Sequence, residues 1–169
     1  MFRSLPMAGA PAAVVRGGQK AEVAEIGGFR RPQFACVSRQ GRCYVSDMSR
    51  DGLITVVSSM GVFESRIGVV ERREESGDGS SSSQPQMSFK GISLSPSEDT
   101  LYAAEFNSNK ICCIDLGEGK VTKWVGGYGK DPGKLWGPLG VSVRANGNLV
   151  VCERMNKRVQ ELSAGGEHV

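Results

Sequence analysis

Histidine is almost absent from this 169-residue chain, whose single copy, His168, stands next to the C-terminal residue. One imidazole argues against zinc sites built from several histidines and against Ser-His-Asp or Cys-His catalysis. The five cysteines contain no C-x-x-C pair, so a zinc ribbon, a RING and a dithiol redox motif are unsupported. No run of about 18 apolar residues occurs, and the sequence therefore predicts no membrane span.

Glycine, in contrast, is abundant. The chain has 23 Gly, 23% charged residues and a formal net charge of +3. Many glycines with ordinary charge indicate many tight turns, as in an all-β protein. So small an excess charge does not by itself imply nucleic-acid binding. The odd, scattered cysteines fit the reduced thiols of a cytoplasmic protein, with a Cys36–Cys43 bridge as the less favoured alternative.

A pattern of strands and turns recurs three times, in residues 32–63, 90–121 and 138–169. Each copy has a short apolar strand, a polar turn, a strand ending in an acid, a third strand and then a glycine before a fourth. The acids are Asp47, Glu105 and Glu153. Six residues after each acid, the third strands begin at Leu53, Ile111 and Val159. Units of about 40–45 residues with four strands are typical of propeller blades.

The second strands of these units are apolar on both faces, as expected for a sheet packed between neighbouring sheets. We therefore predict an all-β fold, a partial β-propeller of about three four-stranded blades. Blade 1 covers residues 30–70, blade 2 residues 88–127 and blade 3 residues 128–169. Gly41 and Gly147 suit the first turns of blades 1 and 3, while the turn of blade 2 lacks glycine.

Three segments fall outside the blades. Residues 1–20 contain Pro and Gly that break any helix, and we expect a disordered N-terminal tail. Residues 21–29 alternate apolar and acidic side chains, which predicts an outer strand of a preceding blade. Residues 71–87 hold a charge block and a serine run, and we expect a flexible insert because they bury little apolar surface.

Blade 3 resembles an NHL repeat in Pro138, Gly140, Gly147, Asn156, Arg158 and Val159. Blade 2 departs from that pattern at Lys90 and Lys110, and blade 1 lacks the Asn-x-Arg element. The resemblance implies a mostly six-bladed propeller. Such propellers occur in tripartite-motif ubiquitin ligases, in RNA-binding regulators and in some enzymes. The resemblance suggests that the chain recognises the substrate in a ubiquitin-ligase pathway.

The three strand-ending acids are the best candidates for chemistry. In a closed ring they could hold calcium, as in propeller hydrolases. We favour pairing with the loop that follows each acid, through Arg50, Lys110 or Arg158. The zinc-dependent NHL-type amidating lyase needs His ligands, and no P-loop, Rossmann or G-x-S-x-G motif is present. The chain is therefore predicted not to be an enzyme and to carry no cofactor or metal.

Loops that follow the second strands share one face with the loops between blades. We predict that this face binds a partner through Arg50, Phe106, Lys110, Tyr128, Arg154 and Lys157. Lys130, Lys134 and Trp136 reach the same face. The preferred hypothesis is a non-catalytic binding module for a protein partner. RNA is the first alternative, because basic and aromatic residues alternate, and a calcium-dependent propeller enzyme is the second.

Three blades would leave two apolar sheet faces open, more than a soluble monomer usually exposes. Two expectations follow: either a homodimer closes one six-bladed ring, or the chain is a fragment of a longer protein. We favour the fragment, because Val169 falls within the last predicted strand and residues 21–29 resemble the end of a missing blade.

Overall fold

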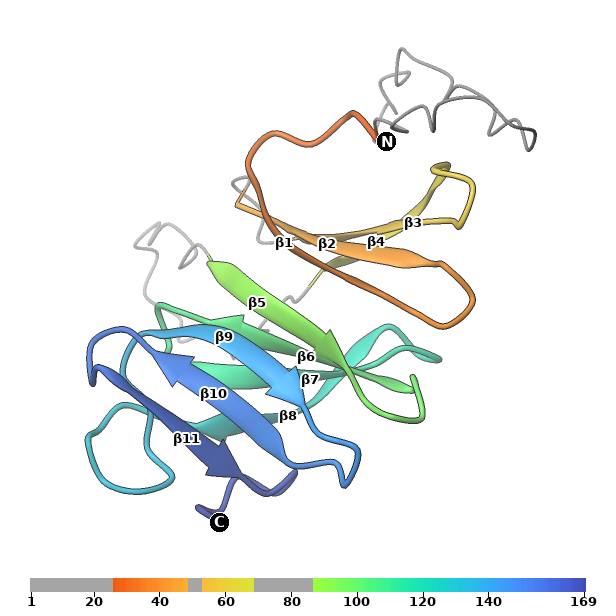
Figure 1. The fold of residues 1–169 in the computed structure, drawn as a ribbon. Helices are drawn as coiled ribbons and strands as arrows, with labels where there is room; N and C mark the ends of the chain where they lie inside the picture. Colours follow the sequence, from red (N-terminus) through yellow and green to blue (C-terminus); the bar gives the residue numbers. More distant parts are fainter. Residues whose placement is uncertain (1–25, 49–52, 69–86) are drawn as a thin grey trace, which may run out of the picture.

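The computed structural model describes residues 26–48, 53–68 and 87–169, which form three antiparallel sheets (Figure 1). The first sheet contains β1 (Pro32–Val37), β2 (Cys43–Asp47), β3 (Leu53–Val57) and β4 (Phe63–Gly68). The second contains β5 (Phe89–Leu94), β6 (Thr100–Glu105), β7 (Lys110–Asp115) and β8 (Lys120–Gly126). The third contains β9 (Pro138–Val143), β10 (Leu149–Glu153) and β11 (Arg158–Leu162). Within these ranges, no helix is long and apolar enough to cross a membrane.

The first strand of each sheet lies against the first strand of the next, so that β5 stands between β1 and β9 (Figure 1). Gly91 in β5 makes this approach sterically feasible. A Cβ on Gly91 would lie 2.6 Å from the Cα of Gly140 in β9. The sheets therefore stack around a common inner edge formed by their first strands.

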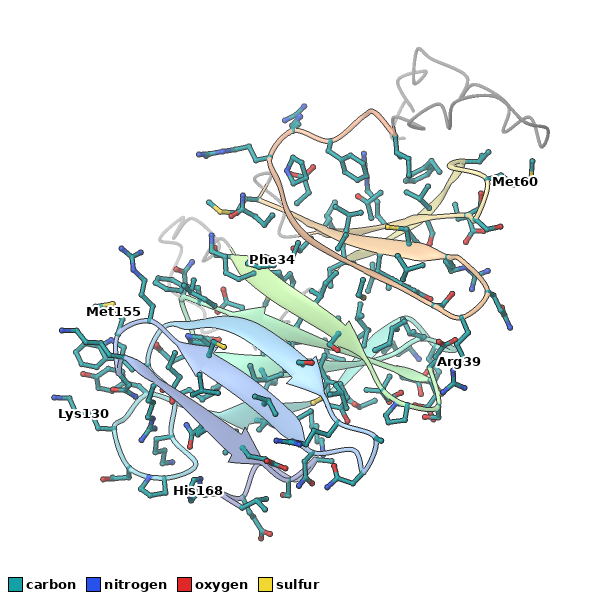
Figure 2. The ribbon with its side chains drawn as sticks, in the orientation of Figure 1. Phe34, Arg39, Met60, Lys130, Met155 and His168 are labelled. Carbon is teal, nitrogen blue, oxygen red and sulfur yellow. The ribbon has the colours of Figure 1, made fainter. Side chains whose placement is uncertain are left out.

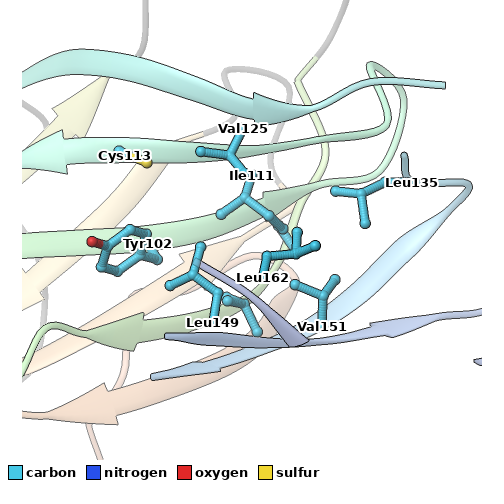
Figure 3. Close-up of a cluster of buried hydrophobic side chains, with 10 residues drawn as sticks. Tyr102, Ile111, Cys113, Val125, Leu135, Leu149, Val151 and Leu162 are labelled. Atoms are coloured by element: carbon cyan, nitrogen blue, oxygen red, sulfur yellow. The ribbon is translucent and has the colours of Figure 1, made fainter. Parts of the chain in front are cut away.

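Two hydrophobic clusters fill the spaces between sheets. Between the first two sheets lie Tyr44, Ile54, Val56, Phe89, Leu101, Cys112 and Ile114. Between the second and third sheets lie Tyr102, Ile111, Cys113, Val125, Leu135, Leu149, Val151 and Leu162 (Figure 3). The second sheet is therefore apolar on both faces because each face is a core, as the sequence pattern predicts.

The first turn of every sheet uses one left-handed residue, but the residue type differs. Gly41 and Gly147 have φ values of 82° and 87°. Glu98 takes the same place in the second sheet with a φ of 62°. Its carboxylate accepts the backbone N–H of Arg39 at 2.7 Å, a contact that ties this turn to the first sheet.

Two details differ from the sequence prediction. The fourth strand expected in blade 3 is reduced to one isolated bridge between Leu162 and His168. In the first sheet, Asp47 pairs with Leu53, whereas Glu153 pairs with Arg158. Ile54, and not Leu53, is therefore equivalent to Ile111 and Val159. The loop after β2 is one residue longer than the loops after β6 and β10, so a fixed six-residue spacing misplaced the alignment.

Several predictions concern residues that the structure does not describe, or describes only in part. The tail of residues 1–20, Arg50 and positions 71–86 of the insert lie outside the described residues. Residues 26–29, the described end of the predicted outer strand, are not in a strand.

Candidate functional site

The three strand-ending acids anchor the chain that enters the first strand of their own sheet. Asp47 accepts the backbone N–H groups of Arg30 and Arg31 at 2.9 and 2.8 Å, just before β1. Glu105 does the same for Ser88, just before β5, at 2.7 Å. A carboxylate is well suited to this task, because hydrogen bonds to an ionised acceptor are stronger than neutral ones.

Glu153 is the centre of a larger network in the third sheet. It accepts the backbone N–H of Trp136 at 2.8 Å, the side-chain amides of Asn156 and Gln160 at 2.6 and 2.8 Å, and Arg158 Nε at 2.6 Å. Its side chain is fully buried. A buried carboxylate needs a cation and several donors, and this network supplies both. The predicted pairing of an acid with its following loop is thus confirmed for Glu153 and Arg158.

Each of the three acids bonds the chain of its own sheet, and the three sheets are separate. Across residues 26–48, 53–68 and 87–169, no three His, Cys, Asp or Glu side chains come together in an arrangement that could hold a metal ion. The acids are therefore not brought together as the calcium ring that the enzymatic alternative requires.

The same network fixes the segment that links the second and third sheets, residues 127–137. The Arg158 guanidinium donates to the carbonyls of Lys130, Asp131 and Lys134 at 2.6 to 3.1 Å. Asn156 donates to the Gly129 carbonyl at 2.9 Å. The guanidinium has five N–H donors, so Arg158 can hold three carbonyls and the Glu153 carboxylate together, whereas a lysine ammonium has only three donors. The Asn-x-Arg element of blade 3 thus shapes this linker.

The linker presents an aromatic cluster, which we define as Tyr128, Lys130 and Trp136. The two rings meet edge to face with centroids 5.5 Å apart. The Lys130 ammonium nitrogen lies 5.5 Å from the centroid of the indole ring, within the range of a cation–π interaction. Tyr128 is 66% exposed. The cluster is therefore preorganised and faces solvent.

Two further apolar side chains flank this cluster. A Cβ on Gly137 would come within 2.7 Å of Met155 Cγ and 3.2 Å of Phe106 Cε2, so both side chains pack on that glycine. Met155 is 45% exposed. Lys130 and Met155 lie at the same end of the molecule, and Arg39 lies at the opposite end (Figure 2). We call the end with Lys130 and Met155 the loop face.

The predicted binding residues that the structure describes divide into two groups. Phe106, Tyr128 and the exposed pair Arg154 and Lys157 lie on the loop face. Lys110 is half-buried at the start of β7, and its ammonium nitrogen lies 6.0 Å from the Trp124 ring centroid. Sequence reasoning placed the loop that contains Met155 on this face, but it did not select Met155 as a binding residue.

A shallow hollow of about 360 Å³ adjoins the loop face on the free side of the third sheet. Leu139, Cys152 and Val159 supply its apolar wall, and Arg154 and Lys157 stand among the charged residues around it. These two cations are thus shared between the loop face and the hollow.

The chain is similar in structure to solved β-propellers. It aligns with virginiamycin B lyase from Staphylococcus aureus (TM-score 0.59, 15% identity, 82% of this chain and 40% of that one). The calcium-binding protein regucalcin from Agrobacterium tumefaciens gives a TM-score of 0.57 at 16% identity, over 82% of this chain and 43% of that one. The WD40 propeller domain of Doa1 gives 0.53 at 14%, over 77% and 36%. The chain thus spans 36 to 43% of these propellers.

The predicted all-β partial propeller is confirmed by these likenesses. No protein-family model matches the chain, and no curated protein matches it in sequence. The NHL type of the repeat and its link to ubiquitin ligases therefore stay predictions.

The prediction that the chain is not an enzyme is wrong, because proteins with this fold include enzymes. It rested on missing catalytic motifs, yet solved structures of the same fold include a streptogramin B lyase. A propeller supplies a rigid ring of loops on which either binding or chemistry can be built. Missing histidines and phosphate loops exclude particular chemistries, and they do not exclude enzymatic function.

Proposed function

We propose that this propeller module binds a protein partner through its loop face. The observation that carries the proposal is the aromatic cluster, in which exposed Tyr128 rests against Trp136 and Lys130 covers the indole. Tyrosine and tryptophan, together with arginine, are the residue types most enriched among the side chains that dominate binding energy at protein interfaces. Preorganisation lowers the cost of binding, because the linker is already held by Arg158.

Charge on the loop face supports an acidic partner surface. Lys130, Lys134, Arg154 and Lys157 are exposed there, and Asp131 is the exposed acid of the linker. A surplus of cations steers acidic partners toward the face and raises the association rate at low salt. RNA offers negative charge as well, and the experiment below separates the two.

Photo-crosslinking inside cells tests this function. A benzoylphenylalanine in place of Tyr128 is expected to give discrete protein adducts. The same group in place of Asn146, in an exposed turn at the opposite end, is the matched control and should give none. Adding Lys130→Glu should remove the adducts from position 128. Adducts that disappear with ribonuclease, or equal adducts from both positions, would contradict protein recognition.

We further propose that the module is of the NHL type and reads substrates for a ubiquitin-ligase complex. The support is the repeat resemblance together with the Asn156–Arg158–Glu153 network, which gives the Asn-x-Arg element a structural task. The partner crosslinked from position 128 should then become less ubiquitinated in cells expressing Tyr128→Ala. Unchanged ubiquitination of that partner would refute the ligase role and leave protein binding intact.

A further inference from the structure

The hollow on the free side of the third sheet has a repeat-equivalent counterpart inside the molecule. Cys152 and Val159 occupy the positions that Ala104 and Ile111 occupy in the second sheet, as the strand pairings show. Ala104 and Ile111 are fully buried beneath the third sheet. Cys152 is exposed, and Val159 is 62% exposed. The third sheet therefore presents a face of the kind that another β-segment covers.

The inner strand of that face leaves room for another backbone. Gly91 allows β9 to approach β5 in the interior, and Gly140 is its equivalent on the free side. A Cβ on Gly140 would lie 3.7 Å from Cys152 Cβ, which is ordinary contact with space above it. An extended segment can therefore lie close to β9 without meeting a side chain at position 140.

Charge decides what kind of segment fits. In the second sheet the positions equivalent to Arg154 and Lys157 are Phe106 and Asn109, which are uncharged. There Asn109 Oδ1 accepts the Gly137 N–H at 2.8 Å, and Phe106 packs on the same glycine. On the third sheet two exposed cations replace these groups, so the covering segment must supply negative charge.

A second copy of this chain does not meet that demand. If its first sheet covered the hollow, Arg30 and Arg31 would take the places that Trp136 and Gly137 take in the interior. Both arginines precede β1 and are exposed. Four cations would then meet at one edge, and like charges brought together at an interface disfavour association.

We propose that the hollow binds an extended acidic segment of a partner protein. Small apolar side chains of that segment pack on Leu139, Cys152 and Val159, and its carboxylates pair with Arg154 and Lys157. The segment lies across the free face of the third sheet, and every second side chain points to that face, so these side chains give specificity. The inference deepens the proposed protein-binding function and assigns it a second contact surface, separate from Tyr128.

A model peptide tests the chemistry directly. The probe is a short fluorescein-labelled peptide whose alternate residues, two Val followed by two Glu, point to one side, with Thr at the positions between them. Its matched control replaces both Glu by Gln. We expect the full chain to bind the Glu peptide about three- to tenfold more tightly than the Gln peptide at low salt, because two exposed charge pairs form only with Glu. Binding should also slow iodoacetamide modification of Cys152, measured by mass spectrometry.

Variants test whether the peptide binds at the hollow, and whether this binding is independent of Tyr128 on the loop face. The double variant Arg154→Glu/Lys157→Glu and the single variant Val159→Asp should each lose the peptide, while all melting temperatures stay near wild type because these side chains are exposed. Lys120→Glu, a charge reversal at the opposite end, should bind normally. Tyr128→Ala should also bind the peptide normally, because Tyr128 does not line the hollow, even where it lowers ubiquitination of the cellular partner.

Several results would overturn the proposal. Equal affinity for the Glu and Gln peptides removes the electrostatic argument, and unchanged binding by the double variant removes the site. Protection of Cys152 by oligouridylate in place of the peptide would assign the hollow to RNA. A concentration-dependent dimer in sedimentation, with Cys152 protected in it, would assign the hollow to a second copy.

Discussion

Gly91 and Gly140 meet between two sheets, where a Cβ on Gly91 would lie 2.6 Å from the Cα of Gly140. The contact is one-sided, because a Cβ on Gly140 would point to the free face and meet Cys152 Cβ at 3.7 Å. A side chain would therefore clash at Gly91 but not at the equivalent Gly140, because another sheet covers only the face at Gly91.

Replacing these glycines should reveal that asymmetry. Gly91→Ala is expected to lower the free energy of unfolding by about 1–3 kcal/mol, because packed backbone must move apart. Gly140→Ala is the matched control and should stay within about 1 kcal/mol of wild type. Urea denaturation measures both. Equal losses for the two variants would show that the close approach of β5 and β9 is not as described.

Glu153 should be far more important for stability than an exposed acid of the same sheet. Glu153→Ala leaves Arg158, Asn156 and Gln160 without their shared acceptor, and we expect a loss of about 3 kcal/mol. Glu167→Ala, at an exposed position, should change stability by about 0.5 kcal/mol or less. Thermal and urea unfolding should agree, and a small effect at Glu153 would argue against the network.

Replacing Lys157 by a residue that adopts left-handed backbone more easily should stabilise the protein. It has a φ of 52°, and its equivalent in the second sheet is Asn109 with a φ of 60°. Lys157→Asn is expected to raise the unfolding free energy by about 0.5–1 kcal/mol, since lysine pays a steric penalty there. Asn109→Lys should do the reverse and also lose the bond from Gly137. A destabilised Lys157→Asn variant would contradict this backbone geometry.

The five thiols should differ sharply in reactivity. Burial, followed by the neighbouring Cys43, raises the pKa of Cys36 to about 12, and burial raises the pKa of Cys113 to about 11. Because the thiolate is the nucleophile, iodoacetamide should modify exposed Cys152 well before these two in the folded protein. Peptide mass spectrometry follows each site, and the guanidinium-denatured chain, in which all five react, is the control.

The raised pKa of Cys36 also affects the stability of the protein at alkaline pH. Folding favours the protonated Cys36, so its contribution is fully present below the ordinary pKa of 9.0 and is lost as pH rises toward about 12. Wild type should therefore lose more stability over this interval than Cys36→Ala. Parallel losses in both proteins, measured by chemical denaturation at each pH, would show that Cys36 does not titrate as described.

Sequence reasoning found the features that repeat with fixed spacing. The acids at Asp47, Glu105 and Glu153 do end second strands, and the turns at Gly41 and Gly147 are left-handed. It found the corresponding turn of the second sheet and its lack of glycine, but it did not identify Glu98 as the left-handed residue there, because glutamate rarely adopts that backbone conformation. It also misaligned β3, since a one-residue difference in loop length does not disturb an apolar pattern.

The candidate site was only partly within reach of the sequence. Tyr128, Arg154 and Lys157 were predicted from loop positions, and each lies where a partner can reach it. The contact of Met155 with Gly137 and the hollow beside Cys152 were not predicted. Both depend on which strand packs beside which, and that relation joins residues far apart in the chain.

By itself, the sequence determined the all-β repeat, its strand-ending acids and the apolar character of both sheet faces, because these follow from local periodicity and turn chemistry. Only the tertiary structure decided which copies of each repeat position are buried. Ile111 and Val159 are equivalent in sequence, yet Ile111 is completely buried and Val159 is exposed. Their difference arises from the neighbouring sheet that covers one of them, and burial of apolar surface is a property of the packed assembly and not of the strand.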